Sequence, residues 1–146
     1  MKWISKTFDE LNGLELYKIL QLRNEVFVVE QDVVYQDADD KDQKAIHLFL
    51  KDIDKIVAYV RIFNAGDYFE NPSIGRVVVH PQYRRKNFGK EVMEKAIRYV
   101  LINFENKKIE ISAQTYLKKF YNNLGFKEEG EIYLEDTLPH FRMIRK

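Results

Sequence analysis

The sequence predicts an α/β fold in which one mixed β-sheet carries helices on both faces. Two strand-like segments are joined by a short turn, Asp52–Asp54, which requires them to pair as an antiparallel hairpin. A long amphipathic segment separates two later strands, and a crossover of that kind allows parallel pairing. The 3 Pro and 6 Gly residues lie between these segments rather than in a linker, so residues 1–146 are expected to form a single domain.

The first half of the chain is predicted to contain one helix and four strands. Leu16, Ile19, Leu20 and Val26 recur at helical spacing, which indicates a helix with one apolar face. An acidic stretch rich in turn-forming residues, Gln31–Gln43, follows this helix. The expected elements are a strand at Lys2–Phe8, a helix at Leu14–Phe27, and strands at Ala45–Lys51, Lys55–Phe63 and Ser73–Val79.

The second half contains the most regular helical pattern of the chain. It starts at Gly89, and Val92, Met93, Ala96 and Ile97 then repeat at the spacing of one helical face. The remaining expected elements are a strand at Lys108–Ala113, a short helix at Leu117–Leu124 that ends before Gly125, and strands at Lys127–Tyr133 and around His140–Ile144.

Composition excludes several classes of protein. Lys and Arg number 24 and Asp and Glu number 23, so the net charge of +1 argues against a protein that works by global attraction to nucleic acid or to an anionic membrane. The absence of Cys excludes disulfides, Cys-ligated zinc and a thiol nucleophile. No segment has the apolar run of a membrane span or a signal peptide, so a cytoplasmic location without membrane contact is expected.

The sequence also gives no reason to expect a metal. The acidic run that starts at Asp37 is the one candidate for calcium binding. An EF-hand loop would need Gly at its sixth position, which is Asp42, and Glu at its twelfth, which is Leu48. We therefore interpret this run as a solvated or acceptor-facing loop.

A basic loop between a strand and the long helix is the segment that indicates chemistry. The free N–H groups and partial positive charge of a helix N-terminus favour a phosphate group. Arg84, Arg85, Lys86 and Lys90 add formal charge at this point, and Gly89 permits close approach of a ligand. Neither a Walker A loop nor a Rossmann fingerprint is present, and a basic loop that only caps the helix is the alternative.

Two motifs give this loop a family context. Arg84, Asn87 and Gly89 occupy the fixed positions of a segment that resembles motif A of the GNAT acyltransferase superfamily, Gln/Arg-x-x-Gly-x-Gly/Ala, with Asn87 in place of the usual glycine. Downstream, Phe120–Phe126 resembles motif B of that superfamily. The segments that resemble the ElaA-type branch of GNAT proteins are Leu22–Gln31, Tyr35–Asp39, His47–Leu48, Gly75–Val77 and Pro139–His140.

This resemblance implies a sheet that splays between its fourth and fifth strands and binds acetyl-CoA, as co-substrate, in the split. The amides of residues 85–89 would hold the pyrophosphate, and the backbone of Val77–Val79 would pair with the pantetheine arm. A backbone amide would stabilise the oxyanion, and Tyr121 would protonate the departing thiolate. The residues expected to bind the cofactor are Val77, Val78, Val79, Arg84, Arg85, Lys86, Asn87, Phe88, Gly89 and Lys90.

The expected activity is N-acetyl transfer to a primary amine of a small molecule or peptide, by direct attack in a ternary complex. The alternatives are a non-catalytic acyl-CoA sensor or interaction module and, more remotely, a nucleic-acid binder that uses residues 84–86. Tyr121 argues against the sensor, because a binding module needs no acid. The near-neutral charge argues against nucleic acid. The oligomeric state stays open, with a homodimer among the allowed assemblies.

The general base and the acceptor site are less sharply indicated. His47 and His140 are expected to line the acceptor side, with Glu110 as the next candidate base and ordered water as another route. Arg61 and Arg76 lie within apolar strands, where an arginine is either paired or directed to solvent. They are either structural ion pairs or a clamp for a carboxylate on the acceptor.

Overall fold

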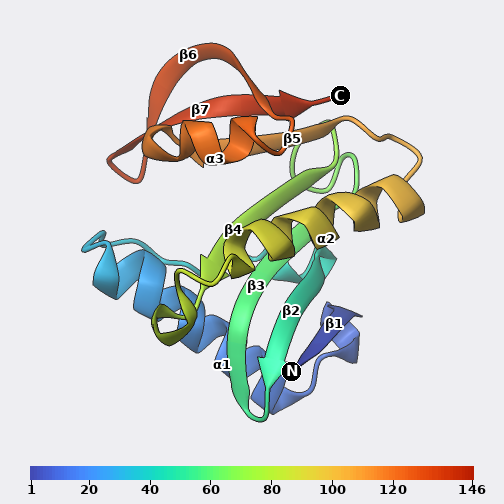
Figure 1. Cartoon of the computed structure of the whole chain (residues 1–146), viewed down its shortest axis with the longest axis vertical. Coiled ribbons are helices and arrows are strands. Elements are labelled where there is room, and N and C mark those ends of the chain that lie inside the picture. The colour runs from blue at the N-terminus through green and yellow to red at the C-terminus, as the bar shows by residue number, and fades with distance from the viewer.

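The fold is a seven-stranded mixed sheet, described by a computed structural model for all residues Met1–Lys146 (Figure 1). The strand order is β1-β2-β3-β4-β5-β7-β6, and every neighbouring pair is antiparallel except β4 and β5. The strands are β1 (Lys2–Thr7), β2 (Ile46–Asp52), β3 (Lys55–Phe63), β4 (Ser73–Val79), β5 (Ile109–Gln114), β6 (Lys127–Glu135) and β7 (Leu138–Arg145). The predicted mixed α/β fold is confirmed.

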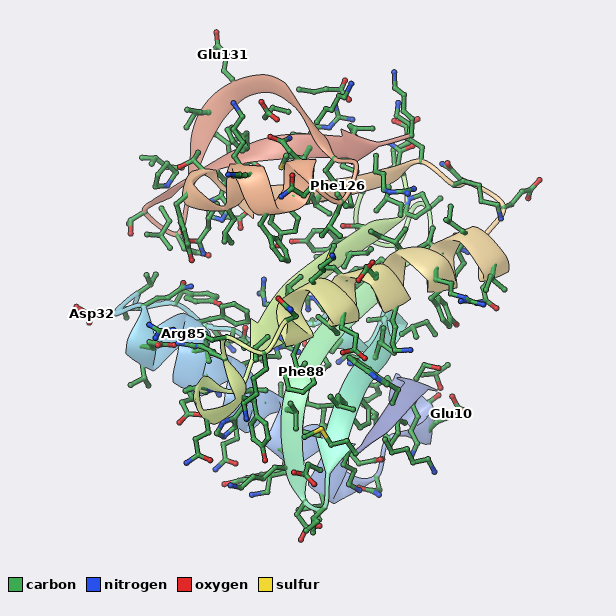
Figure 2. The ribbon with its side chains drawn as sticks, viewed as in Figure 1. Glu10, Asp32, Arg85, Phe88, Phe126 and Glu131 are labelled. Carbon is green, nitrogen blue, oxygen red and sulfur yellow. The ribbon has the colours of Figure 1, made fainter.

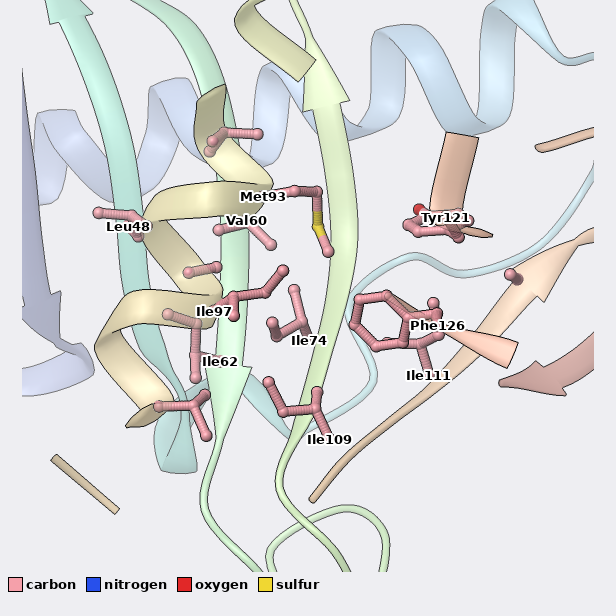
Figure 3. Packing of buried hydrophobic residues seen from close by; sticks show 14 of the residues in the cluster. Leu48, Val60, Ile62, Ile74, Met93, Ile97, Ile109, Ile111, Tyr121 and Phe126 are labelled. Atoms are coloured by element: carbon pink, nitrogen blue, oxygen red, sulfur yellow. The ribbon is translucent and has the colours of Figure 1, made fainter. Parts of the chain in front are cut away.

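Three α-helices accompany the sheet. They are α1 (Gly13–Arg23), α2 (Phe88–Asn103) and α3 (Lys118–Asn122), and a 3₁₀ turn at Thr115–Leu117 leads into α3. Figure 3 shows α2 on one face of the sheet and α1 behind the other, as predicted. None of these helices is both long enough and apolar enough to span a bilayer.

The two faces of the sheet pack against different helices because side chains alternate along each strand. On β3, Val60 and Ile62 pack in the larger core cluster with Met93 of α2, whereas Tyr59 packs in a smaller cluster with Ile19 of α1. Both clusters are almost completely buried. The larger cluster continues past β4 to Tyr121 and Phe126, so the two halves of the sheet share one core (Figure 3).

The predicted helix at Leu14–Phe27 has a different second half. It begins as expected, because Asn12 and Glu15 bond each other's backbone amides at 2.8 and 2.9 Å in a capping box. After Arg23 the chain continues as a π-helical segment, Asn24–Glu30, in which the Gln31 amide bonds the Val26 carbonyl at 3.2 Å. We call residues 24–30 the π segment; such segments are often found at functional sites.

The sheet opens between β4 and β5. These strands share a single paired position, Ser73 with Glu110, and then diverge. Figure 1 shows the result as two halves, with β5, β6, β7 and α3 at the top and the other elements below. The register of β4 against β3 also shifts between Tyr59 and Arg61, where Arg76 has a positive φ of 52°, as in a β-bulge. The family fold implied by the sequence motifs is therefore present.

The last two strands are longer than predicted and form a tight hairpin. Asp136 and Thr137 are the two turn residues between β6 and β7, and both have positive φ, 50° and 67°. Two positive values of φ are typical of a type I′ turn, whose twist matches that of a two-stranded ribbon. The hairpin register places Tyr133 opposite His140.

Candidate functional site

A cleft of about 680 Å³ lies where β4 and β5 diverge. Its walls come from the π segment, β4, β5, the 3₁₀ turn before α3, and the β6–β7 hairpin. A second hollow of about 640 Å³, which we call the loop hollow, lies between the start of α2 and α3. The two adjoin each other, because both are lined by Val79, Arg84, Arg85 and Phe120.

The loop before α2 contains two residues in the left-handed conformation, which occurs in anion-binding turns. Arg85 and Asn87 adopt left-handed φ values of 65° and 64°, whereas Lys86 between them does not. Alternation of right- and left-handed residues turns successive N–H groups toward one side and forms a concave site for an anion. Asn87 immediately precedes α2, so the helix dipole adds to this effect. Figure 2 shows Arg85 and Phe88 on the lower side of the gap and Phe126 on the upper side.

Gly89 lies between the two walls of the loop hollow. A Cβ atom at this position would lie 3.7 Å from Val79 Cγ2 and 3.9 Å from Phe120 Cζ, which are ordinary contact distances. A methyl group would therefore fit, whereas a longer side chain would extend between Val79 and Phe120. The absence of a side chain at Gly89 keeps this path open.

Arg84 is already paired. Its two terminal nitrogens bond the two carboxylate oxygens of Glu30, at 2.6 and 2.5 Å, which joins the π segment to the loop. These hydrogen bonds lower the pKa of Glu30. The free positive charges at this end of the cleft are consequently those of Arg85 and Lys90, which line the loop hollow and form no ion pair.

The structure gathers nearly all the residues predicted to bind the cofactor. Val77, Val78 and Val79 line the cleft, and the residues from Arg84 to Lys90 line the loop hollow with one exception. Lys86 lines neither, and its ammonium lies 5.9 Å from the centre of the Tyr83 ring. The Lys86 side chain is therefore outside both hollows, and its backbone amide is the part of this residue that remains a candidate for binding.

Tyr121 lies on the last turn of α3 and lines the cleft. Its side chain is packed edge-on against Phe120 and Phe126, and it is 7% exposed. Burial raises the pKa of the phenol, so it keeps its proton throughout the physiological range. The predicted acid therefore faces the cleft as a neutral O–H donor.

His140 is the histidine that lines the cleft. It is 6% exposed and lies on β7 opposite Gln114 of β5. Its Nδ1 is 2.8 Å from the carbonyl oxygen of Leu138, and its Nε2 is 3.5 Å from a carboxylate oxygen of Glu135. Tyr133 stacks on the imidazole with ring centres 6.2 Å apart.

His47 does not reach the cleft, and its predicted place on the acceptor side is wrong. It is completely buried, with Nε2 2.9 Å from the carbonyl oxygen of Asp42 and Nδ1 2.7 Å from the Tyr59 hydroxyl. Since a carbonyl oxygen only accepts, Nε2 donates and Nδ1 accepts, and neither nitrogen is free. Burial lowers the pKa of His47, which keeps the ring neutral as a structural group.

The arginine clamp predicted for an acceptor carboxylate is also wrong. Arg61 is 1% exposed, and it bonds Asp39 at 2.7 Å and Asp42 at 2.9 Å. Arg76 does line the cleft, but its Nε bonds Asp37 at 2.9 Å. The alternative of structural ion pairs is correct for both, because the acidic stretch before β2 folds back over these two strands.

Glu110 is excluded as a base that faces the cleft. It lies at the one position where β4 and β5 still pair, which closes the sheet there. Its carboxylate bonds Arg142 at 2.8 Å and Asn71 at 3.2 Å. Although burial raises the pKa of Glu110, the bonds from Arg142 and Asn71 outweigh it, so the pKa is lowered and the group is a poor base.

The wall residues that were not singled out from the sequence include Phe27, Tyr35, Tyr116 and Glu135. Phe27 and Tyr35 lie within segments that resemble the ElaA-type branch, but nothing in their local pattern separates them from core aromatics. The sequence did contain a pattern that could have identified Glu135 as a neighbour of His140. Hairpin pairing about residues 136–137 places it beside the strand that carries His140.

Comparisons with known proteins agree with this architecture. The sequence model of the family described as "Acetyltransferase (GNAT) domain" matches residues 14–146. Protein ElaA of Escherichia coli (strain K12) is 36% identical over 148 residues, which cover 100% of this chain and 97% of that protein. The crystal structure of E. coli ElaA superposes with a TM-score of 0.93 at 36% identity, and each chain is covered completely. An acyl-CoA N-acyltransferase from Pseudomonas aeruginosa gives 0.92 at 35% identity, also with complete coverage of both chains.

Proposed function

Since this chain belongs to the GNAT acetyltransferase family of acyl-CoA-dependent N-acyltransferases, we propose that it transfers an acetyl group from acetyl-CoA to a primary amine of a small molecule or peptide. One observation carries the proposal. Two adjoining hollows place a loop suited to anions next to a wall that holds a neutral phenol and an imidazole. Those are the groups that direct acyl transfer to an amine requires.

Acetyl-CoA would bind along the open edge of β4. Beyond Ser73 that edge is not paired with β5, so its backbone groups at Val77–Val79 are available to the amides of the pantetheine arm. The pyrophosphate would lie at the start of α2, held by the amides of residues 85–89 and by the side chains of Arg85 and Lys90. Gly89 would leave room for the chain between the two groups.

The reaction would proceed by direct attack in a ternary complex. The acceptor loses a proton to His140, and its nitrogen lone pair forms a bond to the thioester carbonyl carbon. A backbone N–H of β4 would stabilise the resulting oxyanion. As the C–S bond breaks, the thiolate takes the proton of Tyr121. The nitrogen, which is positively charged after the attack, gives its second proton through solvent to the phenolate, and His140 releases its proton to solvent. For a protonated amine, the products are the acetamide, free CoA and one released proton.

The test of this function is release of free thiol from acetyl-CoA in the presence of amines. A panel of alkylamines, polyamines, amino acids, aminoglycosides and peptide N-termini is expected to contain acceptors that accelerate thiol release above hydrolysis. Tyr121→Phe should lower kcat by about ten- to a thousandfold, because the thiolate then departs without a positioned acid.

The same variant separates catalysis from binding. Calorimetric titration should show that Tyr121→Phe binds acetyl-CoA as tightly as the unmodified chain. Binding with no thiol release for any amine would support the sensor alternative over an enzyme. Equal kcat values for the two proteins would remove Tyr121 from the mechanism.

A further inference from the structure

The unpaired charges of the cleft are separated by sign. At the loop end, Arg84 is paired with Glu30, which leaves Arg85 as the arginine without a carboxylate partner. The positive charge of Arg76 is compensated by Asp37. At the opposite end, the β6–β7 hairpin contributes the carboxylates of Glu135 and Asp136, and neither pairs with a lysine or arginine. The cleft is therefore positive where a phosphate is expected and negative at the other end, where His140 lies.

The tautomer of His140 follows from its neighbour. Nδ1 lies 2.8 Å from the Leu138 carbonyl oxygen, which can only accept a hydrogen bond. Nδ1 therefore carries the hydrogen, and in the neutral ring Nε2 presents a lone pair. That lone pair faces Glu135 Oε2 at 3.5 Å.

The carboxylate of Glu135 is held in place from its other side. Ser112 Oγ lies 3.0 Å from Oε1 of Glu135 and 2.5 Å from the hydroxyl of Tyr133. Because the carboxylate accepts only, the Ser112 hydrogen goes to Glu135, and the Tyr133 hydroxyl donates to Ser112. Tyr133 also stacks on His140. Contacts of Tyr133, directly and through Ser112, therefore orient both the His140 imidazole and the Glu135 carboxylate.

When the imidazole is neutral, the Glu135 carboxylate and the Nε2 lone pair of His140 therefore face each other with no hydrogen between them. A carboxylate oxygen and an imidazole lone pair at 3.5 Å repel each other, and this repulsion is relieved either by a proton on Nε2 or by a donor with at least two hydrogens that bonds both. A protonated primary amine is such a donor, and its positive charge suits the negative end of the cleft. An amine that also carries a nearby carboxylate would meet Glu135 and Asp136 without a free arginine to compensate it.

We infer that Glu135 and His140 form the binding site for the ammonium group of the acceptor, and that the enzyme selects primary amines without an adjacent carboxylate. This inference rests on the proposed function. The ammonium donates one hydrogen bond to Glu135 Oε2 and one to His140 Nε2. The second hydrogen then passes to Nε2, which leaves the amine neutral and its lone pair free to attack, with the imidazolium held beside Glu135.

The state of His140 can be measured directly, because the chain has 3 histidines and His140→Gln identifies its signals. A long-range proton–nitrogen NMR spectrum near neutral pH should show the neutral Nδ1–H tautomer. Propylammonium chloride should shift the Nε2 resonance, whereas propanol with sodium chloride should not. A doubly protonated ring in the free protein would overturn the inference, because His140 and Glu135 would then form a closed ion pair.

Glu135→Gln tests the carboxylate while it preserves the shape of the side chain and an acceptor for Ser112. It should weaken the propylammonium response, and raise the KM for the amine, by about ten- to a hundredfold, because a charge-assisted bond is lost. The KM for acetyl-CoA should not change. Glu131→Gln is the matched control: it removes the same charge from the same strand, at an exposed position that points away from the cleft (Figure 2).

A pair of acceptors tests the selectivity. Phenethylamine and phenylalanine share an aromatic stem, and only the second carries a carboxylate beside the amine. Phenethylamine should have the higher kcat/KM by at least about tenfold. Equal values, or an amine KM unchanged by Glu135→Gln, would overturn the inference.

Failure of the inference is distinguishable from failure of the proposed function. Suppose that propylammonium shifts the Nε2 resonance in the unmodified chain but not in Glu135→Gln, and that no amine releases thiol. The ammonium site is then supported and the acetyl transfer is contradicted. If amines are acetylated while the Nε2 resonance of His140 does not shift with propylammonium, the acetyl transfer is supported and the ammonium site is contradicted.

Discussion

At the scale of single residues, Gly89 shows how a missing side chain can define a site. Its neighbours Val79 and Phe120 come from β4 and α3, which are distant in sequence but lie within 4 Å of where a Cβ would stand. The hollow between them has room for a methyl group. It has no room for both a long acidic side chain and the proposed pyrophosphate arm, and like charges would repel there.

Gly89→Glu should therefore abolish acetyl-CoA binding, whereas Gly89→Ala should weaken it no more than severalfold. Isothermal titration of both proteins with acetyl-CoA checks this, and circular dichroism confirms that each is folded. Titration heats for Gly89→Glu that match those of the unmodified chain would show that the cofactor does not pass this point.

At the scale of one element, the loop before α2 depends on a backbone conformation that few residues adopt. Asn87 has φ 64° and ψ 16°, which is the left-handed region, and asparagine tolerates that region better than most residues. Its carbonyl accepts the Glu91 amide at 3.0 Å and starts the helix. The family's usual glycine would reach the same conformation without strain.

Asn87→Gly should leave the free energy of unfolding within about 0.5 kcal/mol of the unmodified value, because the left-handed conformation costs glycine nothing. Asn87→Val should lower it by about 1–2 kcal/mol, since a β-branched side chain clashes there. Urea unfolding measures both. Equal stabilities for the two variants would mean that the loop does not hold this conformation in solution.

At the scale of the whole molecule, a buried cluster of charges connects the cleft to the sheet. Arg23 of α1, Arg61 of β3 and Arg76 of β4 pair with Asp37, Asp39 and Asp42 from the acidic stretch before β2. A buried pair is costly to break from one side, because the remaining charge is left without a partner. The cluster thereby fixes the wall that carries Tyr35.

Acid should weaken this cluster in a defined range of pH. Burial alone would raise the pKa of Asp39, but the hydrogen bonds and charge of Arg61 outweigh it and lower that pKa to about 2, from an ordinary value of 3.8. A carboxyl whose pKa is lower in the folded state stabilises the fold above its unfolded pKa. That contribution is lost as the pH falls from about 4 to about 2.

The measurement is urea unfolding of the unmodified chain and of Asp39→Asn at several pH values. The difference between their free energies of unfolding should be largest above about pH 5 and should shrink steadily toward about pH 2. A difference that stays constant over this range would show that Asp39 is not ionised against Arg61 in the folded protein.

The order of elements, the mixed sheet and the basic loop before α2 could be predicted from the sequence, because each depends on residues that are close along the chain. Helical spacing fixes which face of α2 packs inward, and the run from Arg84 to Lys90 contains its own turn, charges and helix start. A local motif also singled out Tyr121, which lines the cleft; its role as the acid stays a prediction.

Which charged and titratable side chains line the cleft became clear from the packing of separate segments. His47 and His140 both sit among apolar neighbours in sequence, yet one is sealed by Asp42 and Tyr59 and the other faces Glu135 across a hairpin. The partners of Arg61, Arg76 and Glu110 likewise come from distant segments. The burial and the neighbours of a side chain depend on how separate segments pack together. Local periodicity cannot predict that packing, because it reports only which face of its own element a residue occupies.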